Sequence, residues 1–533
     1  MSALDVLRQI KQARRNGATE KDKKVVEWGN ADYINEIGVE NLPRRELRNH
    51  LEARDLDVNG TRLELIDRLR SSLADEQLHK FAYTETIDTE TLLKADLEER
   101  GSVYVCGLNN KGQLGMGDME NRKYFTCLPQ LRGAGIVKVI ANIDLSYAIS
   151  GEYDVYVWGG GGVARTGLNP RDGNKGNDQL LFNYLEPIIV TDLMGEEIVD
   201  VRIGSSHALG VGKGGDCFVW GDGDSGQLGL GNLEHHHVVA VNNSFPPVAM
   251  VGCGSNHSIV LTKEGAIYSW GHSVNGRLGI GASERLGAKE NERFYFPTPT
   301  CISTLEPIRM ISCGADHTLA LGISGVWAWG NGAGGRLGTG DNSDRFDPCL
   351  VPRLKGKSVL TIAAGVWHSM CVVAYPPMKK GGWLYTWGSG YHGQLGHSLK
   401  TVCLRAEVVE YFLNHNLLIT EIAAGSHHCA AFTADGEMYT WGSNSHGQLG
   451  RKIDEKDVNY TGMPGHVGGF GAIVGKIGRG FPRSVACGQE FTICCTYPYE
   501  GPDYATATKL MEEAKVREQE ALLAKRKEQQ ANK

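Results

Sequence analysis

The chain has 533 residues and 70 glycines, and its 62 acidic side chains outnumber the 55 lysines and arginines. This length suffices for more than one domain, and no region has the strong positive charge of a protein that binds nucleic acid mainly by bulk electrostatics. No run of 18 apolar residues and no apolar signal-peptide core is present, so we predict neither a membrane span nor secretion. The 13 cysteines include no Cys-x-x-Cys pair, which predicts reduced thiols in an intracellular protein.

Residues 1–39 are predicted to form an N-terminal helix followed by a charged linker. Residues 2–15 combine apolar and basic side chains with helical spacing, and Ser2 and Asp5 fit a capping pair. The helix could dock on a partner, lie on a membrane surface, act as a transit peptide or pack on its own protein. Asp5 and the acidic residues soon after it argue against the transit peptide.

Residues 40–71 are predicted to form a hairpin of two amphipathic helices. Leu47 and Leu51 lie four apart on the first helix, and a capping box opens the second at Thr61. The string ELRNHLEARDLDVNGTRLELIDRL is similar to the SAP module in its leucines, in Gly60 and in Arg62. Members of that family often bind DNA, commonly AT-rich sequence, so the resemblance implies DNA as a partner.

The arginines of this SAP-like hairpin are the candidate phosphate contacts: Arg44, Arg45, Arg48, Arg62 and Arg68. Acidic residues are interleaved with them, so the hairpin is nearly neutral. The alternative is therefore a small helical module that docks on protein, with its arginines paired internally.

Residues 72–100 are predicted to be an acidic linker, and residues 101–498 contain a repeat. The repeat is clearest in MYTWGSNSHGQLG at 438–450, an apolar run that ends in Trp-Gly before a polar turn. A period of about 50 to 60 residues with several short strands in each unit predicts a β-propeller. The glycine of this phrase recurs at Gly107, Gly159, Gly221, Gly271, Gly330, Gly388 and Gly442.

This pattern resembles the regulator-of-chromosome-condensation (RCC) repeat family over about three quarters of the chain. The resemblance implies a mainly β fold, a seven-bladed propeller between the helical hairpin and a C-terminal helix. We expect no enzymatic activity, no cofactor and no metal. Residues 499–533 are predicted to be that helix. Its narrow apolar stripe lacks clean heptads, so it either packs on a partner or stays solvated.

A second phrase, Gly-x-x-His, ends a later apolar run of each repeat. A histidine that recurs in several blades is a structural element, because a catalytic residue would be singular. We predict that these rings hydrogen-bond to backbone between blades. Leu145 and Phe491 replace the histidine in the first and last repeats, which suggests specialised closure blades. The repeat histidines are His207, His257, His317, His368 and His428.

Insertions in the repeats are candidate partner-binding loops at 169–177, 283–293 and 451–479. Three consecutive histidines, 235–237, could suggest a metal site. Successive side chains of a strand point to opposite faces, so the three cannot share one ion, and we predict an exposed loop or strand edge there.

The best-known RCC propeller promotes nucleotide exchange on the small GTPase Ran. Two phrases here, 314–317 and 425–428, are similar to functional phrases of that protein, which makes Asp316 and His427 the candidate GTPase contacts. That protein uses an inserted wedge after a Trp-Gly turn. No Trp-Gly turn in this sequence has extra residues, which argues against exchange activity.

We therefore predict a non-enzymatic scaffold or adaptor that binds one or more proteins on a propeller face and is anchored by its hairpin and terminal helices. Two settings remain open. One is chromatin in the nucleus, with the hairpin on DNA. The other is a cytoplasmic or cytoskeletal assembly, such as one in a cilium. Exchange activity on a Ran-like GTPase is the alternative function.

Overall fold

A computed structural model describes most of the repeat region. The SAP-like hairpin with its five arginines, the flanking linkers and helices, and the loops 169–177 and 283–293 lie outside the described residues. Expectations for those segments stay predictions. The described residues are 102–162, 165–168, 183–281, 294–374, 380–398, 401–453, 459–468, 470 and 482–497.

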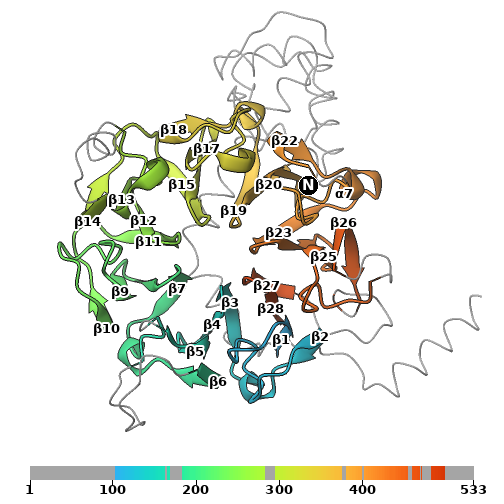
Figure 1. Ribbon diagram of the computed structural model, residues 1–533. Helices are drawn as coiled ribbons and strands as arrows, with labels where there is room; N and C mark the ends of the chain where they lie inside the picture. The colour runs from blue at the N-terminus through green and yellow to red at the C-terminus, as the bar shows by residue number, and fades with distance from the viewer. Residues whose placement is uncertain are drawn as a thin grey trace, which may run out of the picture. The chain divides into compact units, whose positions relative to one another are not determined.

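The described residues form antiparallel sheets arranged around a centre (Figure 1). Each blade, as we call a four-stranded meander, has its first strand nearest the centre and its fourth at the rim. The first five blades in chain order comprise β3 (Ile136–Asn142), β4 (Leu145–Ser150), β5 (Val155–Gly160) and β6 (Asn183–Ile189); β7 (Ile198–Ile203), β8 (His207–Gly212), β9 (Cys217–Gly221) and β10 (His236–Val241); β11 (Val248–Cys253), β12 (His257–Thr262), β13 (Ile267–His272) and β14 (Tyr295–Cys301); β15 (Ile308–Cys313), β16 (His317–Gly322), β17 (Gly325–Gly330) and β18 (Arg345–Leu350); and β19 (Val359–Ala364), β20 (His368–Ala374), β21 (Gly382–Gly388) and β22 (Cys403–Val408).

The next meander is joined to the one before it. A single residue pair, Gly382 with Ile419, links β21 to β23, so the two blades count as one eight-stranded sheet. Further hydrogen bonds join the two blades, among them Val366 N to the carbonyl of Gly425 at 3.3 Å and Trp441 Nε1 to the carbonyl of Gln394 at 2.9 Å. The strands of the second blade are β23 (Ile419–Ala424), β24 (His428–Thr433), β25 (Met438–Ser443) and β26 (Tyr460–Val467).

The two ends of the repeat region share one sheet. Strands β1 (Ser102–Gly107) and β2 (Arg122–Cys127) pair with β27 (Pro482–Cys487) and β28 (Phe491–Thr496) in the order β2-β1-β28-β27. Gly107 lies opposite Phe491 in this ladder. The closing blade thus takes two strands from the first repeat of the sequence and two from the last, and it joins distant parts of the chain. Of the two residues that replace the histidine, Phe491 lies in this blade, whereas Leu145 begins β4 of the following one.

Short helices occupy connections between strands. The described ones are η3 (Pro129–Leu131), η6 (Thr191–Leu193), η7 (Val274–Gly276), η8 (Ala333–Gly335), η9 (Pro352–Leu354) and α7 (Glu410–Asn414).

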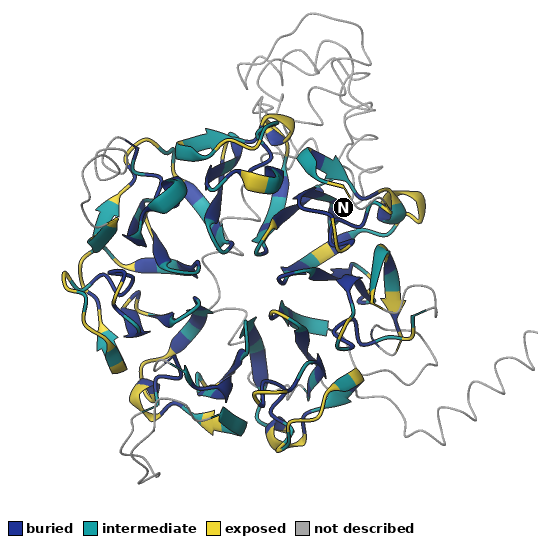
Figure 2. Ribbon diagram, in the orientation of Figure 1, coloured by how far each residue is buried: buried dark blue, intermediate teal, exposed yellow. Residues whose placement is uncertain are grey.

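The core lies between neighbouring blades. The tryptophans of the Trp-Gly phrase are fully buried, and each packs with apolar residues of two adjacent sheets. Trp220 of β9, for example, shares a cluster with Tyr147 of β4 and Val201 of β7. The second and third strands of the blades are mostly buried, the first strands mix buried with intermediate residues, and the rim strands are mostly intermediate or exposed (Figure 2). Burial of this surface requires adjacent blades, as expected for a repeat fold.

One main-chain carbonyl in each blade ties that blade to the next. It belongs to the sixth residue after the glycine of the Trp-Gly phrase, and we call it the latch carbonyl. The carbonyl of Gln227 accepts hydrogen bonds from Trp270 Nε1 at 2.8 Å and from Ser258 Oγ at 2.6 Å, both in the following blade. In the closing blade, Cys106 Sγ and Thr492 Oγ1 take these roles on the carbonyl of Gln448.

The repeat histidines complete this latch. All five are fully buried, and each Nε2 lies against a hydroxyl or thiol of the next blade rather than against backbone, which corrects the predicted partner. Where that hydroxyl donates its hydrogen to the latch carbonyl, the ring must donate from Nε2. Burial lowers the pKa of all five rings, which favours their neutral form. The contacts are His207 with Ser258 (2.9 Å), His257 with Thr318 (3.2 Å), His317 with Ser369 (2.9 Å), His368 with Cys429 (3.0 Å) and His428 with Thr492 (2.9 Å).

The recurring glycine is required by backbone conformation and by space. Gly330 has φ of 102°, in the region that favours glycine. A Cβ at this position would lie 2.5 Å from the carbonyl oxygen of Asp316. The other six glycines of the phrase have φ between 103° and 109° and similar close approaches. The Trp-Gly turn can thus sit directly beside the Gly-x-x-His turn.

The latch predicts a graded effect at Ser369, whose hydroxyl donates to the carbonyl of Arg336 at 2.8 Å and contacts His317. Ser369→Ala should lower the free energy of unfolding by about 1–3 kcal/mol, because the buried His317 Nε2 loses its partner. Ser369→Thr should cost less, since Thr492 serves the equivalent position. Urea denaturation followed by tryptophan fluorescence measures both. Equal losses for the two variants would contradict the latch.

The buried histidines also predict a pH dependence. Burial lowers the pKa of His207 to about 4 and the pKa of His368 and of His428 to about 3. An unfolded histidine has a pKa near 6.5. Between that pH and the lower pKa of the folded ring, the unfolded histidine is protonated while the folded one is neutral. Stability should therefore fall as pH drops from about 6.5 to about 4, by up to about 1.4 kcal/mol per pH unit for each histidine.

This slope can be tested at one blade. His428→Phe copies the residue of the closing blade, Phe491, and removes one titrating ring. Its free energy of unfolding should depend less steeply on pH between 6.5 and 4 than that of the wild type. An unchanged slope would show that His428 titrates normally in the folded state.

Candidate interaction face

Two kinds of turn lie on the same face of the propeller. The Gly-x-x-His turn joins the first and second strands of a blade, and the Trp-Gly turn leaves the third strand at the same end. A backbone hydrogen bond joins the two turns within each blade, as from Asn331 N to the carbonyl of Asp316 at 2.8 Å. We call this surface the Gly-x-x-His face. The residue before the histidine position varies from blade to blade, with aspartate in two of the seven: Asp144, Ser206, Asn256, Asp316, Trp367, His427 and Glu490.

Most of these side chains contact the Trp-Gly turn of the preceding blade. Asp316 pairs with Arg277 at 2.8 Å, and Glu490 lies 3.2 Å from His446 Nδ1. The rings of His427 and His392 have centroids 4.3 Å apart. Burial and the neighbouring His392 lower the pKa of His427. At these boundaries the face consists of side chains that contact one another between adjacent blades.

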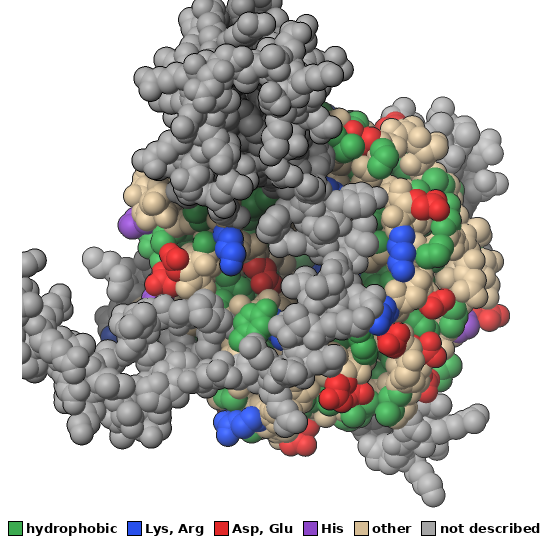
Figure 3. Space-filling view, turned by 180° about the vertical axis from the view of Figure 1, so that it is seen from behind, with side chains coloured by type: hydrophobic (Ala, Val, Ile, Leu, Met, Phe, Trp, Pro, Cys, Tyr) green, Lys and Arg blue, Asp and Glu red, His purple; other side chains and the backbone are tan. Residues whose placement is uncertain are grey.

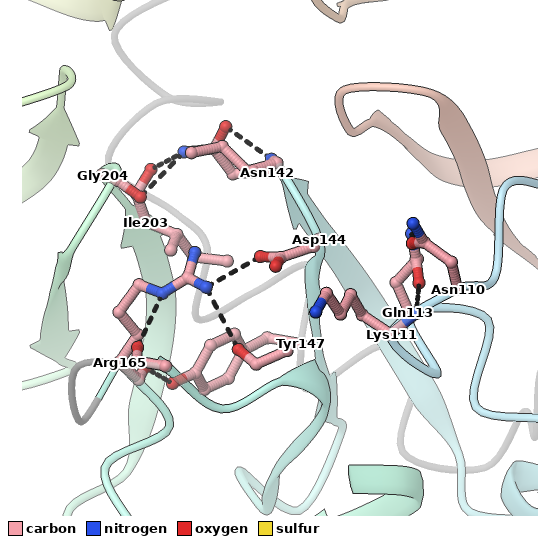
Figure 4. Close-up of polar contacts among 12 residues, drawn as sticks. Asn110, Lys111, Gln113, Asn142, Asp144, Tyr147, Arg165, Ile203 and Gly204 are labelled. Atoms are coloured by element: carbon pink, nitrogen blue, oxygen red, sulfur yellow. Dashed lines mark hydrogen bonds and ion pairs between the residues drawn. The ribbon is translucent and has the colours of Figure 1, made fainter. Parts of the chain in front are cut away.

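The degenerate second Trp-Gly turn makes its contacts differently. Arg165 pairs with Asp144 of its own blade at 2.8 Å (Figure 4). Asn142 instead reaches the next blade, where its Nδ2 donates to the carbonyls of Ile203 and Gly204 at 2.6 and 3.1 Å. This part of the face is closed by polar contacts.

A hollow of about 750 Å³ opens on the same face where the turns of three blades meet. Trp367 and Tyr391 line it and remain 43% and 63% exposed. His392, His427 and Leu404 contribute to its walls. Exposed aromatic side chains beside a hollow are typical of protein-binding surfaces. We take this hollow as the candidate site.

The central channel is a second cavity, of about 550 Å³, lined by the first strands of the blades. Lys138 and Asp200 pair there at 2.8 Å. Burial raises the pKa of Glu421 to about 7, although the Val485 N–H donates to its carboxylate at 3.1 Å. These charged groups contact one another or backbone and account for the polarity of the channel.

The described surface carries both signs of charge. Figure 3 shows one face on which Lys and Arg side chains are interspersed with Asp and Glu among the atoms that are not grey. This agrees with the balanced composition of the chain. Electrostatic binding to nucleic acid calls for a patch of one sign, so the visible surface offers no support for it.

The structure places the two candidate GTPase contacts on one face. Asp316 and His427 occupy equivalent turns two blades apart, but each already contacts a neighbour, Arg277 and His392 respectively. Sequence reasoning missed Trp367, although comparing the repeats position by position would have shown that no other repeat has a tryptophan before its histidine position.

The histidine run lies at a rim strand, as predicted for a loop or edge. His236 begins β10, and the neighbouring His235 is 43% exposed by its side chain. Its ring lies 2.9 Å from Asp222 and 3.4 Å from Asp224, so the three groups satisfy one another. Potential ligand atoms of these residues lie within 4.8 Å of one another, but nothing further points to an ion.

Comparison with known families agrees with this geometry. Residues 237–498 match the family model described as RCC1-like domain, and residues 100–148 match the regulator of chromosome condensation (RCC1) repeat. The matches support an RCC1-like propeller. The RCC repeat resemblance found in the sequence is thereby supported, whereas the SAP resemblance is untested.

Two curated relatives illustrate the range of proteins with such repeats. The ultraviolet-B receptor UVR8 of Arabidopsis thaliana is 31% identical over 357 residues, which are 65% of this chain and 62% of UVR8. The E3 ubiquitin-protein ligase HERC2 of Homo sapiens is 30% identical over 401 residues, 74% of this chain. The chain spans only 6% of HERC2, so the ligase activity in that name is not carried over.

Solved structures show the same fold. Yeast RCC1 (Prp20), crystallised with Kap60, aligns with a TM-score of 0.63 at 19% identity over 78% of this chain and 92% of that chain. A second structure of Prp20p from Saccharomyces cerevisiae, reported with its binding to Gsp1p and histones, has a TM-score of 0.61 at 19% identity and covers 78% and 95%.

None of the helices in the described residues is both long and apolar enough to cross a membrane.

Proposed function

We propose that the chain is a non-enzymatic scaffold or adaptor whose seven-bladed RCC1-like propeller binds proteins on the Gly-x-x-His face. The hollow between Trp367 and Tyr391 carries this proposal, because exposed aromatic residues dominate the binding energy of many protein interfaces. The binding of Gsp1p and histones by Prp20p, a protein of the same fold, supports it.

The hairpin at 40–71 and the terminal helices would fix the place of the propeller in a larger assembly. Two settings compete for that anchor. In the nucleus, Arg44, Arg48 and Arg62 would contact DNA phosphates. In a cytoplasmic, cytoskeletal or ciliary assembly, the same hairpin would contact protein.

The face used can be identified by affinity purification of the full chain. Tyr391→Ser should release proteins that the wild type captures, because it removes an exposed aromatic from the hollow. Ile323 is 64% exposed in the turn between β16 and β17, at the opposite ends of the strands, so Ile323→Ser is the matched control. Loss of partners with Ile323→Ser alone would place the interface on the other face.

The anchor is tested in the same experiment with Arg44→Glu, Arg48→Glu and Arg62→Glu combined. If the hairpin binds chromatin, DNA and histones should copurify with the wild type and be lost from this variant. Retention of a fixed set of structural proteins by both preparations would instead favour the assembly setting.

The second candidate function is nucleotide exchange on a Ran-like GTPase. It is favoured by the place of Asp316 and His427 on one face and by the link of Prp20p with Gsp1p. The ion pair of Asp316 with Arg277 weighs against it, since the carboxylate would have to leave that partner.

Exchange activity predicts a specific loss at Asp316. Release of a fluorescent guanine nucleotide from a Ran-like GTPase should be accelerated by the wild type, and Asp316→Ala should reduce that acceleration at least tenfold. The exposed Asp192 lies in η6, at the opposite ends of the strands, so Asp192→Ala should leave it unchanged. Without any acceleration by the wild type, the exchange function is excluded for the GTPase tested.

A further inference from the structure

Arg336 is a buried cation at a position where other blades carry glutamine or a paired arginine. It is the sixth residue after Gly330, and the equivalent residue in the preceding blade is Arg277. Arg277 pairs with Asp316 at 2.8 Å. Arg336 faces Trp367 at the position that corresponds to Asp316, so this turn offers it no carboxylate.

The remaining contacts of Arg336 are weak for a buried charge. Its side chain is fully buried, Nε donates to the carbonyl of Ala333 at 2.8 Å, and Nη1 reaches the carbonyl of Val366 at 3.4 Å. Nη2 has no hydrogen-bond partner in the described structure. Burial lowers the pKa of Arg336 to about 10. A buried guanidinium without a carboxylate is costly, and a partner anion would offset that cost.

The nearest carboxylates are already engaged. Asp316 and Asp344 raise the pKa of Arg336 from a distance, but neither forms an ion pair with it within the described residues. Asp316 is held by Arg277. Asp344 accepts hydrogen bonds from Gly332 N at 2.9 Å and from Asn275 Nδ2 at 2.7 Å. The missing anion is therefore not supplied by these residues.

Trp367 separates Arg336 from the hollow. The guanidinium carbon lies 4.2 Å from the centre of the indole ring, and the indole lines the hollow while 43% exposed. No aspartate or glutamate is among the described residues that line the hollow, whereas His392 and His427 are. A carboxylate that entered there would meet no like charge on the walls.

We propose that the hollow binds an acidic side chain of a protein partner, which displaces the Trp367 indole and pairs with the guanidinium of Arg336. This inference rests on the proposed protein-binding function and names the chemistry that the site selects. An aspartate or glutamate can accept two parallel hydrogen bonds from the guanidinium. The displaced indole then packs on the partner chain beside Tyr391, which gives the acidic residue an apolar neighbour.

The sharpest variant is Arg336→Gln, because glutamine is the residue of Gln113, Gln227, Gln394 and Gln448 at the equivalent positions. In those turns the side-chain oxygen accepts a hydrogen bond from the backbone two residues earlier, as from Ser225 N to Gln227 at 2.8 Å. The latch carbonyl is main chain and is kept. Arg336→Gln should therefore fold, which thermal denaturation verifies. The matched control is Arg277→Gln, which removes an arginine that already has its carboxylate.

The probe is a random 12-residue peptide library displayed through its C-terminus, so that only side chains supply carboxylates. Peptides selected on the full-length wild type should share an aspartate or glutamate. They should bind Arg336→Gln at least tenfold more weakly and Arg277→Gln about equally. Changing the shared acidic residue to its amide should cause the same tenfold loss on the wild type and little further loss on Arg336→Gln.

Three results would overturn the inference: selected peptides without a common acidic residue, equal binding to Arg336→Gln, or no selection at all. Tryptophan fluorescence gives an independent measurement. Binding of an acidic peptide should change the tryptophan emission of the wild type, because the Trp367 indole moves. The same peptide should not cause this change in Trp367→Phe. Peptides that bind wild type and Arg336→Gln equally, but no longer bind Tyr391→Ser, would still support protein binding on the Gly-x-x-His face. In that case only the acidic specificity fails.

Discussion

The architecture depends on one carbonyl in each blade that accepts hydrogen bonds from the next. The carbonyl of Arg336 receives Trp387 Nε1 at 2.9 Å and Ser369 Oγ at 2.8 Å, and the same serine meets the ring of His317. These groups are fully buried, so loss of any of them leaves an unsatisfied partner in a dry environment. Association of apolar faces alone would permit blades to slide, whereas this contact fixes their register.

The hydrogen bonds to the latch carbonyls hold the blades together whatever side chain the latch residue carries. It uses the main chain of its residue, so the side chain at that position is free to be glutamine or arginine without loss of the interblade bonds. The neighbouring Gly-x-x-His turn is likewise held by backbone contacts. The side chain of its variable residue, the one before the histidine position, takes no part in the hydrogen bonds to the latch carbonyl. The molecule can therefore present different chemistry in each blade on one rigid frame, which is what a binding face requires.

The repeats in the sequence predicted the fold but not the candidate interaction site. The Trp-Gly period predicted short strands and a β-propeller because the same steric demand, a glycine with positive φ beside a second turn, recurs in every blade. The partner of each histidine could not be predicted, since it comes 51 to 64 residues later in the next blade. The pairing of β1 with β28 was not predicted either, since it joins the two ends of the repeat region.

The hollow lies at blade boundaries whose covering residues are not acidic. At Arg277 and at His446, an acidic residue of the next blade covers the boundary and joins the two turns. At the two boundaries between them, the covering residues are Trp367 and His427, and neither offers a negative charge. Among the described residues, the lining of this part of the face contains no carboxylate, which leaves it open to an anion from outside.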